Sequence, residues 1–135
     1  MITGNPLRPE LEGGSRDTAV AKLGLDPSRP LVYVTGGAQG SHTVNRTLGV
    51  ILGELTRAAQ VIHQCGDNPT TSDMMWLEER WRELSVEQRG RYRVVPYVGS
   101  DLREIYSAAS LVVGRAGAGT VNECCHLGLP ALLIP

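Results

Sequence analysis

The segment "LVVGRAGAGTVNECCHLGLPALLIP" (residues 111–135) contains the pattern that decides the fold. It begins with a strand-like run over 111–117 that ends in a glycine-rich turn, continues as a helical stretch over 119–128, and closes with an apolar run at 131–135. Gly128 is a typical helix stop, because glycine enters the left-handed conformation without steric cost. A strand, a helix and a strand joined by short connections predict two parallel strands with a crossover helix.

The same alternation extends over the rest of the chain. Strand-like runs rich in β-branched residues occur at 31–36, 61–66 and 92–98, and helical patterns occur at 15–25, 41–57, 72–84 and 100–109. Continuous apolar runs are typical of strands that are buried on both faces of a sheet. The sequence therefore predicts an α/β fold with a Rossmann-like, doubly wound parallel sheet of about five strands. Ser72 or Asp73 is the expected cap of the helix over 72–84.

The composition is that of one ordinary globular domain. Hydrophobic residues make up 41% and charged residues 20% of the 135 residues, and the net charge of −1 gives no electrostatic footprint for nucleic acid. The three cysteines have no zinc-binding spacing and are expected to be reduced thiols in a cytoplasmic protein. No apolar run approaches the roughly 18 residues that span a membrane. No Asp-x-Asp motif occurs, so we expect neither a metal nor a cofactor.

The first candidate site is the loop "TGGAQGSHT" (35–43), which joins a strand to a long helix. Glycines let the backbone approach a ligand closely, and the free N–H groups of the following helix suit a phosphate. The loop lacks the Gly-Lys-Ser/Thr of a Walker A motif, and its glycines read G-G-x-x-G instead of the dinucleotide fingerprint G-x-G-x-x-G. A tight strand-to-helix turn without a ligand explains the loop equally well.

The second candidate site is the loop "GRAGAGT" (114–120), which leads to Glu123. Thr120 and Glu123 have the spacing of a capping box, in which the glutamate reaches back to the backbone at the helix start. Alternatively, a glutamate in the first turn accepts hydrogen bonds from a ribose diol, because helical side chains lean toward the N-terminus. The two loops follow strands that are expected to be neighbours, and together they predict a ligand with a nucleotide diphosphate.

The remaining histidines and tryptophans favour structural roles. His63 lies within a strand-like run and is expected to be an interior residue with satisfied hydrogen bonds, whereas His42 is expected to be a solvated residue at a helix start. Trp76 and Trp81 are expected to contribute to packing and not to sugar stacking.

Several motifs resemble the MurG family of N-acetylglucosaminyltransferases, which make lipid II in bacterial peptidoglycan synthesis. The matches run in order over nearly the whole chain, and the last is quite specific to this group of glycosyltransferases. They are "TGNPLR" (3–8), "GGAQGS" (36–41), "VNR" (44–46), "IHQCG" (62–66), "VPYV" (95–98), "Y-x-x-A" (106–109) and "RAGAGTVNE" with "LGLPALLIP" (115–135).

The resemblance implies the C-terminal half of a GT-B fold, in which two Rossmann-like domains face a cleft. Residues 16–135 would form the domain that binds UDP-N-acetylglucosamine, and residues 1–15 would be a lead-in from an N-terminal domain. That other domain would bind the lipid-linked acceptor, touch the cytoplasmic face of the membrane and supply the base. The chain is expected to stop before the final loop and helix of the fold, to contain no catalytic residue and to be inactive alone.

The resemblance also implies roles for single residues. Glu123 would bind the ribose hydroxyls, the backbone of Val98 would pair with uracil, and Arg8 would reach the donor site. Arg115 would either form an ion pair, with Glu123 for example, or contact phosphate. The diphosphate and sugar would lie against the two glycine-rich loops, at Gly37, Ala38, Gln39, Gly40, Gly117, Ala118, Gly119 and Thr120.

One residue departs from the family pattern. Ala38 stands where family members often have a serine whose hydroxyl contacts phosphate. Backbone N–H groups of the loop would then carry this contact, with Ser41 or Thr43 as possible substitutes.

Three alternatives stay open. A related glycosyltransferase with another lipid or natural-product acceptor would keep the same donor loops, and a donor-binding subunit with a separate acceptor subunit would explain a short chain. An oxidoreductase of the NAD type fits the fold but lacks the fingerprint. Apolar surface left uncovered near the C-terminus predicts some self-association.

Overall fold

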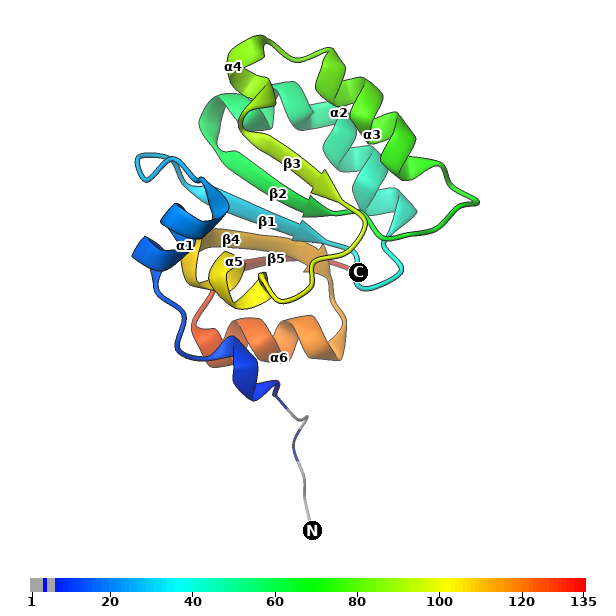
Figure 1. The fold of residues 1–135 in the computed structure, drawn as a ribbon. Helices are drawn as coiled ribbons and strands as arrows, with labels where there is room; N and C mark the ends of the chain where they lie inside the picture. Colours follow the sequence, from blue (N-terminus) through cyan, green and yellow to red (C-terminus); the bar gives the residue numbers. More distant parts are fainter. Residues whose placement is uncertain (1–3, 5–6) are drawn as a thin grey trace.

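The core of the structure, a computed structural model that describes residue 4 and residues 7–135, is a parallel sheet of five strands (Figure 1). Its strand order is β3-β2-β1-β4-β5, which is the order of the first five strands in a Rossmann fold. The predicted Rossmann-like sheet is therefore confirmed. The strands are β1 (Leu31–Thr35), β2 (Gln60–Gln64), β3 (Tyr92–Val95), β4 (Ala109–Arg115) and β5 (Ala131–Ile134).

The strand order reverses at β1, and this reversal positions the site. From β1, the strands β2 and β3 follow one another toward one edge of the sheet. β4 then pairs with the other side of β1, with Tyr33 opposite Val112. All neighbouring pairs are parallel, so their carboxyl ends lie at one edge of the sheet. In open α/β sheets, ligands bind outside these ends at the point of reversal.

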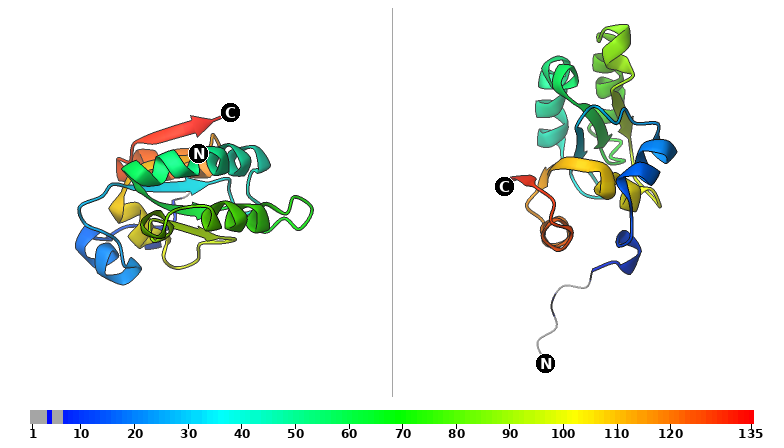
Figure 2. Two further views of the ribbon diagram at one scale, coloured as in Figure 1. Left: turned by 90° about the horizontal axis from the view of Figure 1, so that it is seen from above. Right: turned by 90° about the vertical axis from the view of Figure 1, so that its left-hand side faces the viewer.

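Helices cover both faces of the sheet (Figure 2). One face packs against α2 and α3, with the short α4 lying against α2, and the other face packs against α1, α5, α6 and the 3-10 turn η1. The turn η1 and helix α4 were not predicted, because both are too short to show a helical period. The helices are η1 (Pro9–Leu11), α1 (Arg16–Leu23), α2 (His42–Ala58), α3 (Asp73–Arg82), α4 (Val86–Arg89), α5 (Leu102–Ala108) and α6 (Ala118–Leu127).

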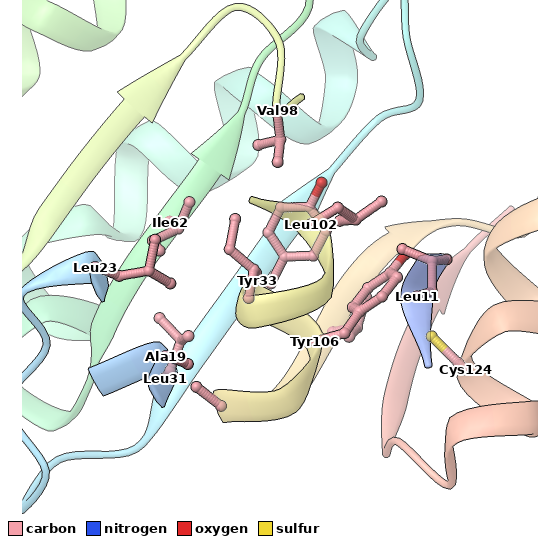
Figure 3. Close-up of a cluster of buried hydrophobic side chains, with 13 residues drawn as sticks. Leu11, Ala19, Leu23, Leu31, Tyr33, Ile62, Val98, Leu102, Tyr106 and Cys124 are labelled. Carbon is pink, nitrogen blue, oxygen red and sulfur yellow. The ribbon is translucent and has the colours of Figure 1, made fainter. Parts of the chain in front are cut away.

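The sheet separates two hydrophobic clusters. Tyr33, Ile62 and Tyr106 belong to the cluster shown in Figure 3, and Val34 and Leu52 belong to the cluster on the other face. Every residue of β1 and β2 is buried, which confirms the prediction for these central strands. The prediction holds only in part for β3 and β4, which are partly buried, and it is wrong for β5, whose residues are mostly exposed because this strand packs mainly against β4.

Residues next to the helix ends account for the start of α2 and the end of α6, but not for the start of α3. The Ser41 hydroxyl accepts the Val44 N–H at 3.3 Å and so caps α2. Gly128 is left-handed with φ of 66° and ends α6 as predicted. The expected side-chain cap of α3 is wrong: Ser72 is itself left-handed, and the Asp73 carboxylate binds groups of α2 instead.

The expected lead-in is in part an integral piece of the domain. Leu11 is buried in the core cluster, and the Ser15 hydroxyl accepts the Thr18 N–H at 3.1 Å to cap α1. Within "TGNPLR", residues 3, 5 and 6 lie outside the described residues. In the part of the chain that the structure describes, no helix combines the length and apolarity needed to cross a bilayer.

Candidate functional site

A cavity of about 220 Å³ lies at the carboxyl ends of β1 and β2, between the two glycine-rich loops. Seven of the residues predicted from sequence line it: Arg8, Gly37, Ala38, Val98, Gly119, Thr120 and Glu123. Tyr33, Thr35, Gln64, Tyr97, Leu102 and Tyr106 complete the wall. Residues that are up to 115 positions apart in sequence thus meet at one place, which is the point of strand reversal.

The other predicted residues do not line the cavity. Gln39 and Gly40 lie in the first loop beside residues that do, and Gly117 and Ala118 form the start of α6. Arg115 is exposed at the end of β4, and within the described residues it makes no ion pair. The predicted ion pair between Arg115 and Glu123 is therefore wrong.

The backbone of the first loop requires glycine. Gly37 and Gly40 have φ of 87° and 77°, in the left-handed region. A Cβ on Gly40 would lie 2.0 Å from the carbonyl oxygen of Cys65, so the loop and the end of β2 are in direct backbone contact. Ser41 is buried as the cap of α2 and does not line the cavity. Its hydroxyl therefore does not take the place of the serine hydroxyl that family members often have at position 38.

Among the residues that the structure describes, Glu123 carries the only carboxylate on the cavity wall. Its Oε1 accepts two hydrogen bonds from Arg8, at 2.7 Å from Nη2 and 3.1 Å from Nε. Its Oε2 accepts one from the Tyr106 hydroxyl at 2.7 Å. The predicted capping box is wrong, because α6 already begins at Ala118 and places Glu123 beyond the reach of the helix start.

Burial fixes the protonation of the tyrosines around this carboxylate. Desolvation raises the pKa of Tyr33 to about 12, and it raises the pKa of Tyr106 further, with the Glu123 charge adding to the effect. The hydrogen bond to Glu123 raises the pKa of Arg8. At neutral pH, both Arg8 and Tyr106 therefore keep their protons and donate hydrogen bonds to Glu123.

Gln64 is a lining residue that the sequence did not reveal. Its side chain is buried at the end of β2, where Oε1 accepts the Val98 N–H at 2.7 Å and Nε2 donates to the Gly37 carbonyl at 2.9 Å. Gln64 thus ties the first glycine-rich loop to the loop that follows β3. Its place at the carboxyl end of a predicted strand was the one signal available. Tyr97, which is 61% exposed, and Tyr106 were missed as lining residues too.

A network of buried hydrogen bonds centred on His63 and Asn45 lies next to the cavity, at the end of β2. His63 contacts the Tyr92 hydroxyl and the Asn45 Oδ1, both at 2.9 Å, which confirms the interior histidine. Burial lowers the pKa of His63 to about 4, so it is neutral at pH 7. Asn45 in turn donates to the Cys65 carbonyl at 2.9 Å and to Asp73 at 2.8 Å. The network holds the start of α2 against the end of β2, directly beneath the glycine-rich loop.

A larger cavity of about 500 Å³ lies at the opposite end of the strands. It is lined by the first residues of β1, β2 and β3 and by four arginines: Arg82, Arg89, Arg91 and Arg93. Because ligands of open α/β sheets bind at the carboxyl ends, the smaller cavity is the candidate site. Among residue 4 and residues 7–135, no group of three or more His, Cys, Asp and Glu side chains is placed to hold a metal ion.

Comparison with known proteins identifies the family of the chain. The family model for the "Glycosyltransferase family 28 C-terminal domain" matches residues 31–135. The chain is 38% identical to the UDP-N-acetylglucosamine–N-acetylmuramyl-(pentapeptide) pyrophosphoryl-undecaprenol N-acetylglucosamine transferase of Bifidobacterium adolescentis, over 98% of this chain and 38% of that protein. The enzyme of the same name from Thermus thermophilus is 43% identical over 89% of this chain and 31% of its own length. The chain thus spans about a third of the length of these curated relatives.

Two solved structures have the same fold. Acinetobacter baumannii MurG superposes on the whole chain with a TM-score of 0.66 at 23% identity, over 36% of its own length. Sucrose-phosphate synthase from Thermosynechococcus elongatus covers 93% of this chain with a TM-score of 0.57 at 22% identity, over 33% of its own length. The family model, the relatives and the fold agree with the resemblance found in the sequence: the chain belongs to the glycosyltransferase family 28 C-terminal domain family.

Proposed function

We propose that this chain binds UDP-N-acetylglucosamine and that its enzyme transfers N-acetylglucosamine to a lipid-linked muramyl-pentapeptide in peptidoglycan synthesis. The observation that carries the proposal is the carboxylate of Glu123 on the wall of a cavity between two glycine-rich loops that lead into helices. The names of the relatives state the same donor sugar and acceptor for those proteins.

The cavity wall suits the parts of a nucleotide diphosphate. The loop at Gly37 and Ala38 precedes α2, and Gly119 and Thr120 lie in the first turn of α6, so backbone N–H groups and two helix dipoles favour the diphosphate. Ribose hydroxyls would donate to Glu123. The Val98 N–H already donates to Gln64, which leaves the Val98 carbonyl to accept from uracil.

In the proposed reaction, a hydroxyl of the acceptor sugar attacks the anomeric carbon of N-acetylglucosamine while UDP leaves, with inversion at that carbon. Negative charge then grows on the leaving diphosphate, and oriented N–H groups at the two helix starts stabilise it without reorganisation. We assign the base that takes the acceptor proton to a further domain, which would also bind the lipid at the cytoplasmic face of the membrane. The 135 residues are then a donor site that does not turn over alone.

Calorimetric titration of the chain with UDP, UDP-N-acetylglucosamine and NAD tests this proposal. We expect binding of both uridine nucleotides and no binding of NAD. Replacement of Glu123 by Gln removes the charge that accepts the ribose hydroxyls and should weaken UDP binding about tenfold or more. Glu54→Gln is the matched control, because Glu54 is exposed on α2 and does not line the cavity. Equal loss in both variants, or tighter binding of NAD than of UDP, would contradict the proposal.

A further inference from the structure

The Glu123 carboxylate is nearly saturated with donors from the protein itself. A carboxylate offers about four lone-pair sites. Arg8 fills two of them on Oε1, and Tyr106 fills one on Oε2. A ribose diol brings two further donors, so the ligand and the protein compete for the same oxygens, and at least one hydrogen bond from the protein has to be lost.

Tyr106 is the partner that stays. Its side chain is 4% exposed within the buried cluster of Figure 3, and its ring packs edge-on against Tyr33 with centroids 5.7 Å apart. Moving its hydroxyl away from Oε2 would leave a buried donor without a partner, which is costly. Tyr106 therefore fixes the orientation of the Glu123 carboxylate and acts as a positioning residue.

Arg8 is the partner that is free to leave. Its side chain is 48% exposed, whereas that of Glu123 is 12% exposed. Arg8 precedes η1 and lines the same cavity as the first glycine-rich loop, so its guanidinium is near the place proposed for the diphosphate. Guanidinium groups bind phosphate oxygens with paired, charge-assisted hydrogen bonds, which replace those lost at the carboxylate.

We propose that Arg8 is an exchangeable partner of Glu123: ribose hydroxyls displace it from Oε1, and it transfers to the diphosphate of the same ligand. This inference rests on the proposed function and adds a specificity-determining role for Arg8. A nucleoside without phosphate has to break the contact between Arg8 and Glu123 and offers nothing in return. A nucleoside diphosphate breaks the same contact and supplies a new anion for Arg8. Arg8 therefore discriminates against uridine and in favour of UDP.

Titration of the wild-type chain and of Arg8→Ala with uridine and with UDP tests the exchange. We expect Arg8→Ala to bind uridine about threefold more tightly, because Oε1 is vacant, and to bind UDP about tenfold more weakly. Arg80→Ala is the matched control: Arg80 lies on α3, is 35% exposed, pairs with the Glu83 carboxylate at 2.8 Å and does not line the cavity, so its loss should change neither affinity. Thermal unfolding of each variant verifies that the fold is kept, and Arg8→Gln provides a second uncharged variant.

The exchange is refuted if Arg8→Ala lowers the affinities for uridine and UDP by the same factor, or leaves the uridine affinity unchanged. The two proposals fail differently. If wild-type chain does not bind UDP, the proposed function fails and the exchange fails with it. If wild-type chain binds UDP through Glu123 but uridine does not gain from Arg8→Ala, only the exchange fails.

Discussion

Gly40→Ala is the sharpest test of how the first glycine-rich loop is held. Gly40 has φ of 77°, and a Cβ there would lie 2.0 Å from the Cys65 carbonyl oxygen. The left-handed conformation costs a residue with a Cβ about 1–2 kcal/mol. Relief of the backbone overlap adds about 1–3 kcal/mol, as for overpacked cores. We therefore expect Gly40→Ala to lower the free energy of unfolding by about 2–5 kcal/mol, a large part of the stability of a typical domain.

Gly37→Ala separates the two contributions. Gly37 has φ of 87°, but a Cβ there meets nothing within 4 Å, so only the conformational cost of about 1–2 kcal/mol should appear. Urea unfolding followed by circular dichroism gives both free energies under the same conditions. Equal destabilisation by the two variants would refute the inferred backbone contact between the loop and the end of β2.

Three further predictions concern other parts of the fold. The pKa of His63 is about 4 in the folded chain against 6.5 in the unfolded chain, so about 3 kcal/mol of the free energy of unfolding is present above pH 6.5 and is lost as the pH falls toward 4. In urea titrations, His63→Gln should lose less stability over this range than wild type, and equal losses would contradict this. Gly53→Ala should raise the free energy of unfolding by about 0.5–1 kcal/mol and with it the urea midpoint, because Gly53 lies inside α2 with no atom within 4 Å of an added Cβ. A lower midpoint would contradict this. Leu132 is 57% exposed on the edge strand β5, so we expect the chain to self-associate and Leu132→Glu to reduce this association in light scattering. A wild-type chain that stays monomeric at high concentration would rule this out.

Local patterns were sufficient for the sheet and for much of the site. Buried strands, glycine-rich loops and helix stops are encoded within short windows, and the reversal of strand order brings the two loops together. For this reason the local patterns placed Gly37, Gly119 and Glu123 at one site, whereas Val98 was placed there only by the family resemblance.

The partners within the site could not be predicted, because they depend on long-range packing. Thr120 and Glu123 have the spacing of a capping box, but the helix begins two residues before Thr120, and the carboxylate meets Arg8 instead. Nothing near Gln64 in the sequence indicates that it bridges two loops. The same holds for Asp73, which binds α2 and leaves α3 without a side-chain cap.

We propose that uridine nucleotides bind at the carboxyl ends of the strands. Amide chemical shifts of isotope-labelled chain, recorded during titration with UDP, locate the bound nucleotide directly. We expect the largest shifts at Gly37, Gly119 and Glu123, around the smaller cavity. Shifts concentrated at Gly24 and Gly90, in the arginine-lined cavity at the opposite end of the sheet, or no shifts at all, would contradict it.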